Sequence, residues 1–179
     1  MAFTTTLIGS NSGTEHKAYN IDWSVGLIGS NARDDVMLTQ ALLRILYYEL
    51  LGFNDGLDPP PDATDPISVD GIKGPITQKH IVHLQKQLVE RGQKVVQDGT
   101  FDPFRKSQAL STITKSQYAF ELLNSACIRF CLQHGMSNYD TLQSRQDIPV
   151  TLRNALTTVK KTARQYTYVQ VTVPATGGA

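Results

Sequence analysis

The sequence predicts a mainly α-helical fold with a short two-stranded β element. Apolar residues recur at helical spacing along several segments, as in helices that bury one face. Glycine, proline and acidic residues stand where such helices would begin and end. Strict alternation of apolar and polar residues is confined to two short segments, 21–25 and 166–173. With 179 residues, of which 40% are hydrophobic, the chain is large enough to bury a core.

The first two helices are expected at residues 31–51 and 75–91. In the first, valine and leucine residues recur along one face, and Asn31 or Asp34 can cap the amino terminus. In the second, Pro75 occupies the first helical position, where its missing N–H removes no helical hydrogen bond. The loop between the two helices is polar and rich in proline, which excludes further helix there.

Two further helices are expected in the carboxyl-terminal half of the chain. One spans residues 115–134 and is followed by Gly135, a residue type that commonly ends helices. The other begins near Pro149 and carries leucine residues at helical spacing. Cys127 and Cys131 lie on the first of these helices and are interpreted as small buried apolar residues, because a core of this size needs no disulfide.

Both ends of the chain are expected to be extended. Residues 1–20 are rich in Thr, Ser, Gly and Asn, which predicts an arm or loop with a short extended piece at 5–8. The alternating segments 21–25 and 166–173 predict strands. Because a lone strand needs a partner, we expect these two to pair, with pairing of the tail to another chain left open as a route to an oligomer or assembly.

Charge and hydropathy exclude several classes of partner. Lys and Arg total 17 and Asp and Glu total 16, so the formal charge of +1 creates no strong field for nucleic acid or anionic membrane. A local basic patch is left at Lys160, Lys161 and Arg164. No apolar run of about 18 residues predicts a membrane span, and no secretory signal is recognised at the start. We expect synthesis in the cytoplasm and, for a target outside, delivery to the periplasm or cell wall by a non-Sec route.

The most informative segment is 69–77, Val-Asp-Gly-Ile-Lys-Gly-Pro-Ile-Thr, which places a tight turn directly before a helix. Gly71 is expected at positive φ, and Asp70 can accept hydrogen bonds from its own turn. A second such turn, Asp98-Gly99, resembles a weak repeat of the first. The simplest interpretation of these residues is structural.

A functional interpretation is compatible with the structural one. A rigid turn and the start of a helix would border a shallow groove, and free backbone N–H groups there suit a peptide carboxylate or a sugar amide. The candidate ligand-binding residues are Asp70, Gly71, Lys73, Gly74, Thr77 and His80.

Chemistry by a metal or a nucleophile is less well supported. His80 and His83 lie on one predicted helix, but a zinc site needs three or four converging donors and no second cluster occurs in the sequence. Cys131 and His134 share a helix without the oriented base and third group that a thiol nucleophile needs. We therefore predict no catalytic residue, no metal site and no cofactor.

Two further patterns could indicate a protein that cleaves or binds sugars. The acidic pairs Asp34/Asp35 and Asp98/Asp102 could imitate a glycosidase pair, but helix capping and turn formation explain them more simply. Aromatic residues could offer faces for stacking on sugars, although aromatics at helical spacing usually belong to the core. These residues are Trp23, Tyr47, Tyr48 and Phe53.

Two sequence blocks together resemble the peptidoglycan-binding domain family over about residues 25–104. The first block runs from Gly29 to Leu43 and contains Asp-Val followed by Gln-Ala-Leu-Leu; the second is the segment 69–77 with the helix after it. The sequence departs from the family at Thr39, where an apolar residue is usual, at His80, where a small one is usual, and at Leu84, which replaces a typical Phe.

The resemblance implies a three-helix core at 25–104, preceded by an arm and short strand at 1–24. Residues 105–179 would then form a helical extension that ends in a strand. It also implies a non-enzymatic module that recognises bacterial peptidoglycan. The absence of a recognised signal favours a component of a phage tail or contractile secretion system.

Two alternatives stay open at this point. A protein–protein adaptor would use a repurposed version of the same core and dock by strand addition through the segment 166–173. A small hydrolase would release soluble fragments from the cell wall. The predicted partners are therefore peptidoglycan or a protein, with no nucleic acid and no membrane.

Overall fold

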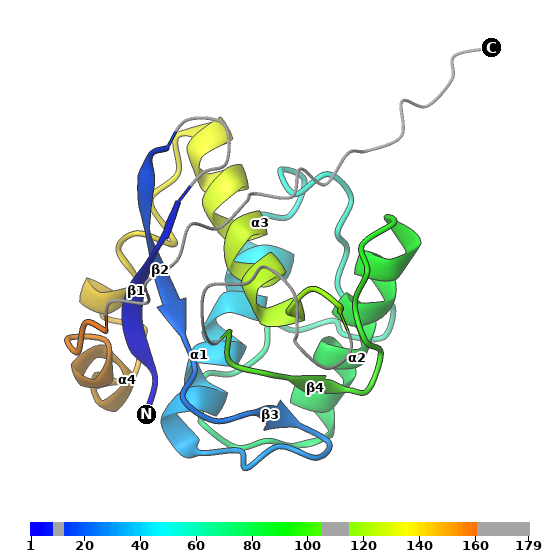
Figure 1. Ribbon diagram of the computed structural model, residues 1–179, viewed down its shortest axis with the longest axis horizontal. Helices are drawn as coiled ribbons and strands as arrows, with labels where there is room; N and C mark the ends of the chain where they lie inside the picture. The colour runs from blue at the N-terminus through cyan, green and yellow to red at the C-terminus, as the bar shows by residue number, and fades with distance from the viewer. Residues whose placement is uncertain (9–12, 105–114, 161–179) are drawn as a thin grey trace.

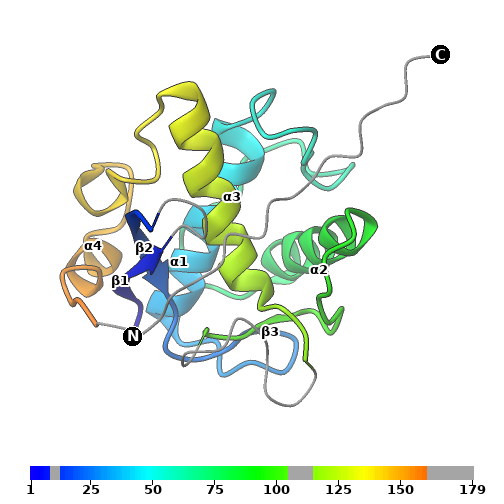
Figure 2. The ribbon, with the colours of Figure 1, turned by 45° about the horizontal axis from the view of Figure 1, so that its top comes forward.

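The computed structural model describes residues 1–8, 13–104 and 115–160. These residues form a mixed α and β fold with four α-helices and two small antiparallel sheets (Figure 1). The expectation of a mainly α-helical protein with a three-helix core, a helical extension and one short β element is therefore wrong. Figures 1 and 2 show α1 and α3 in the middle of the molecule, with the β1–β2 hairpin and α4 on one side and α2 on the other.

The amino-terminal segment forms a β-hairpin, where an arm or loop with a short extended piece at 5–8 was expected; only the extended piece is found, within β1. Strand β1 (Phe3–Ile8) pairs in antiparallel register with β2 (Glu15–Asn20), so that Phe3 faces Asn20 across the ladder. Threonine is common in polar loops as well as in strands, so composition alone does not predict this hairpin. Threonine is β-branched and fits a pleated strand, and Leu7 and Tyr19 anchor the hairpin in the core.

The second edge of β1 is joined to the end of the described chain. The Thr4 N–H donates to Thr158 O and the Lys160 N–H donates to Thr4 O, both at 2.9 Å, which makes a parallel bridge. The Thr4 hydroxyl donates to Leu156 O at 2.7 Å. The predicted strand 166–173, its pairing with 21–25 and most of the basic patch lie outside the described residues.

The second sheet is short and lies toward the lower edge of the molecule in Figure 1. Strand β3 (Val25–Gly26) pairs with β4 (Thr100–Phe101), which brings the start of the segment 25–104 against the Asp98-Gly99 turn near its end. The strand expected at 21–25 therefore forms only at its last residue and continues into Gly26.

The helices lie close to their expected positions. Helix α1 (Arg33–Arg44) continues as a π-helical turn, η1 (Ile45–Glu49), and α2 spans Pro75–Glu90 with Pro75 at its first position. Helix α3 (Ala119–His134) ends at Gly135, which has φ of +63° as expected for that position. A short 3₁₀ helix, η2 (Leu142–Ser144), precedes α4 (Val150–Ala155).

Two helix starts differ from prediction. The residue before α1 is Ala32, and no side chain caps this helix. Asn31 instead has φ of +53° and accepts from the Gly26 N–H at 2.8 Å. Helix α3 begins at Ala119, because Gln117 is tied to Val95 in a β-bridge and cannot join the helix.

The core is one continuous cluster that takes residues from all three expected segments of the chain, for example Leu7, Leu42 and Phe120. Cys127 and Cys131 are buried in it as free thiols, which confirms that interpretation. Within residues 1–8, 13–104 and 115–160, every helix is too short or too polar to cross a lipid bilayer.

Candidate ligand-binding site

The Asp70-Gly71 turn has the geometry that the sequence predicts. Gly71 has φ of +76°, and the Ile72 N–H donates to Asp70 Oδ1 at 2.8 Å. A Cβ atom at Gly71 would lie 2.6 Å from Arg33 Cγ and 3.1 Å from Arg33 O, so the turn also packs closely on α1. The glycine is therefore required both by backbone conformation and by space.

A buried glutamine on α1 fixes this turn. Gln40 is 2% exposed, and its Oε1 accepts from the N–H groups of Asp70 at 3.1 Å and Gly71 at 2.9 Å. Its Nε2 donates to Asp70 Oδ1 at 2.8 Å, and to Ile72 O and Thr77 Oγ1 at 3.1 Å. One side-chain amide thus satisfies both the turn and the start of α2.

The start of α2 presents backbone donors next to the turn. Gly74 precedes the helix without a side-chain cap, and the first helical bond runs from the Gln78 N–H to Gly74 O at 3.0 Å. The N–H groups of Ile76 and Thr77 come before that bond, and within the described residues they have no acceptor. They lie at the positive end of the helix dipole, where a carboxylate or carbonyl oxygen binds favourably.

These elements border a hollow of about 260 Å³, here called the first hollow. One wall is the turn with the start of α2, and the other is the end of the proline-rich loop. Its carboxylates are those of Asp65 and Asp70, and Ile72 and Ile76 are 67% and 64% exposed at its lining. The lining residues are Gln40, Asp65, Pro66, Ile67, Ser68, Asp70, Ile72, Gly74, Pro75, Ile76 and Thr77.

The structure brings part of the predicted ligand set together. Asp70, Gly74 and Thr77 line the first hollow. Gly71 and Lys73 belong to the same turn but do not line it. His80 lies one helical turn beyond Thr77 and is fully buried, so it cannot reach a ligand there without rearrangement.

Both ring nitrogens of His80 are occupied inside the fold. Nδ1 donates to Ile76 O at 2.8 Å, which leaves Nε2 to accept from the Tyr48 hydroxyl at 2.8 Å. Burial lowers the pKa of the imidazole, and the neighbouring His83 and Lys79 add to this effect. His80 is therefore held neutral beneath the first turn of α2.

The other chemical candidates do not converge on a site. His83 Nε2 lies 3.0 Å from Asp58 O, and no group of three or more potential metal ligands gathers among the residues that the structure describes. Burial raises the pKa of the Cys131 thiol, so it is a poor nucleophile, and His134 packs on Phe53 with ring centroids 4.9 Å apart.

The acidic and aromatic candidates separate into different roles. Asp35 is fully buried and accepts from the N–H groups of Asp22 and Trp23, both at 3.1 Å, so it fixes the segment after β2. Trp23 is 54% exposed and Phe53 is 48% exposed. Tyr47 and Tyr48 pack toward His80, and Tyr47 is fully buried.

Gln40 belongs to the first of the two resembling blocks, but neither its hydrogen bonds to the turn nor the loop wall at 65–68 was predicted from the sequence. A polar amide among the apolar positions of a helix was the available signal, because such a group must find partners when it is buried. No sequence pattern indicated that residues 65–68 would form a wall of the hollow. The approach of this wall to the turn depends on how the loop crosses α2, which no local pattern encodes.

Comparisons of the chain with models of protein families, with curated proteins and with solved structures found no match. The resemblance to peptidoglycan-binding domains therefore rests on the two sequence blocks. The geometry described above shows how those blocks meet: Gln40 of the first block holds Asp70 and Gly71 of the second.

Proposed function

We propose that this protein is a non-enzymatic binding module that recognises the peptide of bacterial peptidoglycan through the first hollow. The resemblance supplies the substrate class, and the hollow supplies a place with suitable chemistry. At about 260 Å³ it lies below the roughly 300–1,000 Å³ of sites for drug-sized ligands, so it accommodates one residue of a polymer better than a sugar chain.

One observation carries the proposal: groups that attract a positive charge and groups that attract a negative charge belong to residues of the same small hollow. The Asp65 side chain and the second carboxylate oxygen of Asp70 have no partner among the described residues. Ile76 and Thr77, whose N–H groups have no acceptor among the described residues, line the same hollow. Carboxylates favour an ammonium group, and the helix start favours a carboxylate.

A ligand that carries both groups on one carbon fits this arrangement. The diamino acid of a peptidoglycan stem peptide has a free amine, and meso-diaminopimelate adds a carboxylate beside it. In this pose the amine lies near Asp65 and the carboxylate near the start of α2. Recognition of this kind requires no bond to be made or broken.

The proposal is tested by co-sedimentation with purified peptidoglycan sacculi at physiological salt. Ser68 is exposed in the lining, and Ser68→Trp would fill the hollow; Thr64→Trp changes an exposed residue of the same loop outside it. We expect the native chain and Thr64→Trp in the pellet and Ser68→Trp in the supernatant. Equal retention of all three chains would contradict a site at the first hollow.

A charge variant tests the ammonium contact separately. Asp65→Asn should weaken binding of a stem tripeptide about two- to fivefold, the range of an exposed ion pair. Asp58→Asn removes the same charge from the same loop outside the hollow and should leave binding unchanged. Isothermal titration calorimetry measures both, and equal affinities for the two variants would rule out the contact.

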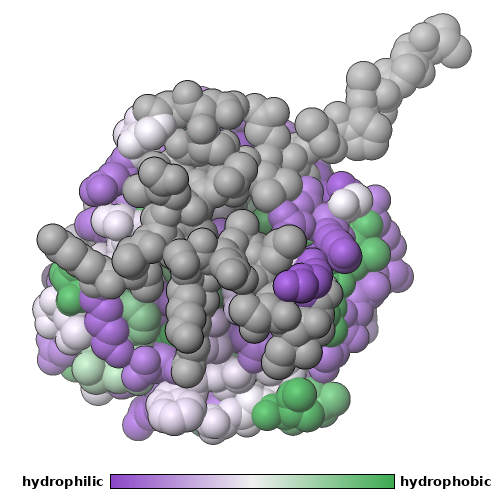
Figure 3. Space-filling view, in the orientation of Figure 1, coloured by the Kyte–Doolittle hydropathy of each residue, from purple (hydrophilic) through white to green (hydrophobic). Residues whose placement is uncertain are grey.

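A protein-binding adaptor is the second candidate, and one surface favours it. Apolar surface gathers at the lower edge of the face in Figure 3, below β3 in the orientation of Figure 1. The loop after β3 carries Leu27 and Ile28, which are 67% and 78% exposed. Absence of the native chain from the sacculus pellet would favour the adaptor, whereas release of soluble muropeptides would indicate a hydrolase.

Delivery by a phage tail or contractile secretion assembly is part of the proposal and rests on the resemblance. A secretion assay in cells with and without such an assembly tests it. Appearance of the protein outside the cell only when the assembly is present is the expected result. Equal appearance in both strains would exclude this route.

A further inference from the structure

We propose that the chain carries a second binding site of the same chemical class at the Asp98-Gly99 turn, so that one molecule holds two stem peptides. This inference rests on the proposed function for the identity of the ligand. Its structural basis is independent, because it comes from an internal repeat and from a hollow that the repeat creates.

The second turn repeats the hydrogen bonds of the first. Gln85 on α2 is 1% exposed, and its Oε1 accepts from the Gly99 N–H at 2.8 Å. Its Nε2 donates to Asp98 Oδ1 at 3.2 Å and to Thr100 O at 2.9 Å. Asp98 Oδ1 also accepts from the Thr100 N–H at 2.9 Å, and Gly99 has φ of +70°.

Each bond has its counterpart in the first turn. Gln40 corresponds to Gln85, Asp70 to Asp98 and Ile72 to Thr100, with the same atoms donating and accepting. Both turns reach a proline four residues after the glycine. The weak repeat seen in the sequence is therefore a repeat of structure.

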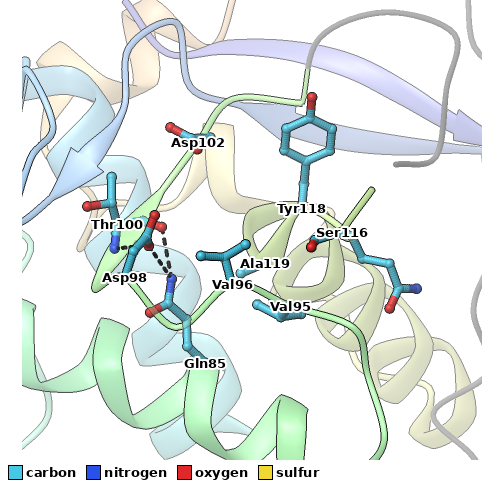
Figure 4. Close-up of a pocket in the computed structure, with 10 residues that line it drawn as sticks. Gln85, Val95, Val96, Asp98, Thr100, Asp102, Ser116, Tyr118 and Ala119 are labelled. Carbon is cyan, nitrogen blue, oxygen red and sulfur yellow. Dashed lines mark hydrogen bonds between the residues drawn. The ribbon is translucent and has the colours of Figure 1, made fainter. Parts of the chain in front are cut away.

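A second hollow of about 190 Å³ lies beside this turn (Figure 4). It is lined by four residues that correspond in position to lining residues of the first hollow. These are Gln85, Asp98, Thr100 and Asp102, which match Gln40, Asp70, Ile72 and Gly74. The repeat thus places a hollow of similar size against the same side of each turn.

The second hollow also contains two carboxylates, like the first. Asp98 and Asp102 line it, and neither forms an ion pair with a Lys or Arg of the described chain. Asp102 Oδ1 accepts from the Ser24 hydroxyl at 2.6 Å, which leaves its other oxygen for a ligand. Both hollows therefore favour a ligand with a primary ammonium group.

The wall of the second hollow that lies opposite the Asp98-Gly99 turn differs from the corresponding wall of the first hollow. Figure 4 shows Tyr118 and Ser116 across the hollow from Asp98, with Val95 and Val96 between the two sides. Tyrosine and valine provide apolar surface for the carbon chain of an amino acid whose ammonium group meets the carboxylates. Tyr118 and Ala119 also place the start of α3 in this lining, so the second hollow, like the first, borders a helix start.

The two sites share helix α2, which sets their separation. Thr77 lines the first hollow and Gln85 the second, and this interval on a helix corresponds to about 12 Å along the axis. A polymer that repeats its peptide can engage both hollows at once, and the second contact is then intramolecular. Binding to sacculi should accordingly be much tighter than binding to one soluble peptide.

The test follows backbone amide signals by NMR while the tripeptide L-Ala-γ-D-Glu-meso-diaminopimelate is added. We expect saturable shifts at Gly71 and Ile72 and, separately, at Gly99 and Thr100. Ser68→Trp should abolish only the first set. Val96→Trp, which fills the second hollow, and Asp102→Asn, which removes a carboxylate there, should abolish or weaken only the second set.

Val150→Trp is the matched control, because Val150 is exposed on α4 and lines neither hollow. It should retain both sets of shifts and full retention on sacculi, whereas Val96→Trp should lose at least about tenfold in apparent affinity for sacculi. Circular dichroism melting shows whether each variant is folded, and Asp102→Asn tests the site without added bulk.

The outcomes separate this inference from the proposed function. Shifts at the first turn alone would overturn the second site and leave peptidoglycan binding intact. Shifts at the second turn alone would support the second site and contradict the first. No shift at either turn would overturn both.

Discussion

The Asp70-Gly71 turn and the Asp98-Gly99 turn are each folded around one buried glutamine, but their surroundings differ. At the first turn, Gln40 forms five hydrogen bonds and also reaches Thr77 at the start of α2. At the second, the corresponding glutamine forms three. A buried glutamine therefore holds both turns, whereas the residues across each hollow from the turn differ.

Glycine substitution should show the largest difference between the two turns. Gly71→Ala combines positive φ, worth about 1–2 kcal/mol, with overpacking against the stem and backbone of Arg33, worth about 1–3 kcal/mol. At Gly99 the nearest atom is the flexible end of Gln78, so Gly99→Ala should cost about 1–2 kcal/mol plus one side-chain hydrogen bond. Urea denaturation measures both, and a larger loss at Gly99 would contradict this ranking.

Replacement of the glutamines should rank next. Gln40→Leu leaves the N–H groups of Asp70 and Gly71 without their acceptor and should cost about 2–4 kcal/mol. Gln85→Leu removes fewer bonds and should cost about 1–3 kcal/mol. The midpoints of chemical denaturation give the two values. Gln93→Leu is the control for loss of a buried glutamine outside both turns. If Gln40→Leu and Gln85→Leu lowered the free energy of unfolding equally, the difference in the number of hydrogen bonds would not affect stability.

Mild acid should destabilise the fold through the start of α2, because His80 is buried there and is bonded to Ile76 O. The pKa of folded His80 is lowered, so the unfolded chain binds more protons, and stability should fall as the pH drops below about 6.5, the ordinary histidine pKa. His80→Gln keeps a donor and an acceptor but does not titrate, so its loss of stability between pH 7.5 and 5.5 should be smaller than that of the native chain. Identical pH dependence would exclude His80 as the cause.

The smallest effect is expected at the edge of the second hollow. Ser24→Ala removes the exposed hydrogen bond to Asp102 and should cost less than about 1 kcal/mol, since water replaces the lost donor. Affinity for the stem tripeptide at the second site should change by less than about twofold, because the carboxylate remains. Thermal melting and calorimetry check the two expectations; a loss above twofold would show that Ser24 positions Asp102.

Local sequence was sufficient for the turns and for the starts of some elements. Gly71 and Gly99 adopt positive φ, Pro75 opens α2 and Gly135 ends α3, as their residue types predict. Each of these outcomes depends on steric or hydrogen-bonding preferences within a few residues. They could be predicted because no distant partner decides them.

The hairpin and the buried site residue were not predictable in this way. Threonine at 4–6 fits either a polar loop or a strand, and its place in β1 depends on pairing with β2 and with Thr158 and Lys160. His80 was placed at a ligand site from its position after the turn. Its burial against Tyr48 depends on how α2 packs on η1.

The sequence by itself determined two glycine turns, the helix that follows the first of them and a core large enough to hold them. Only the tertiary structure decided that Gln40 and Gln85 hold those turns and that a hollow lies beside each. The reason is the range of the forces involved. Backbone preferences act between neighbouring residues, whereas a buried amide takes its partners from whichever distant segment the packed core brings within hydrogen-bond distance.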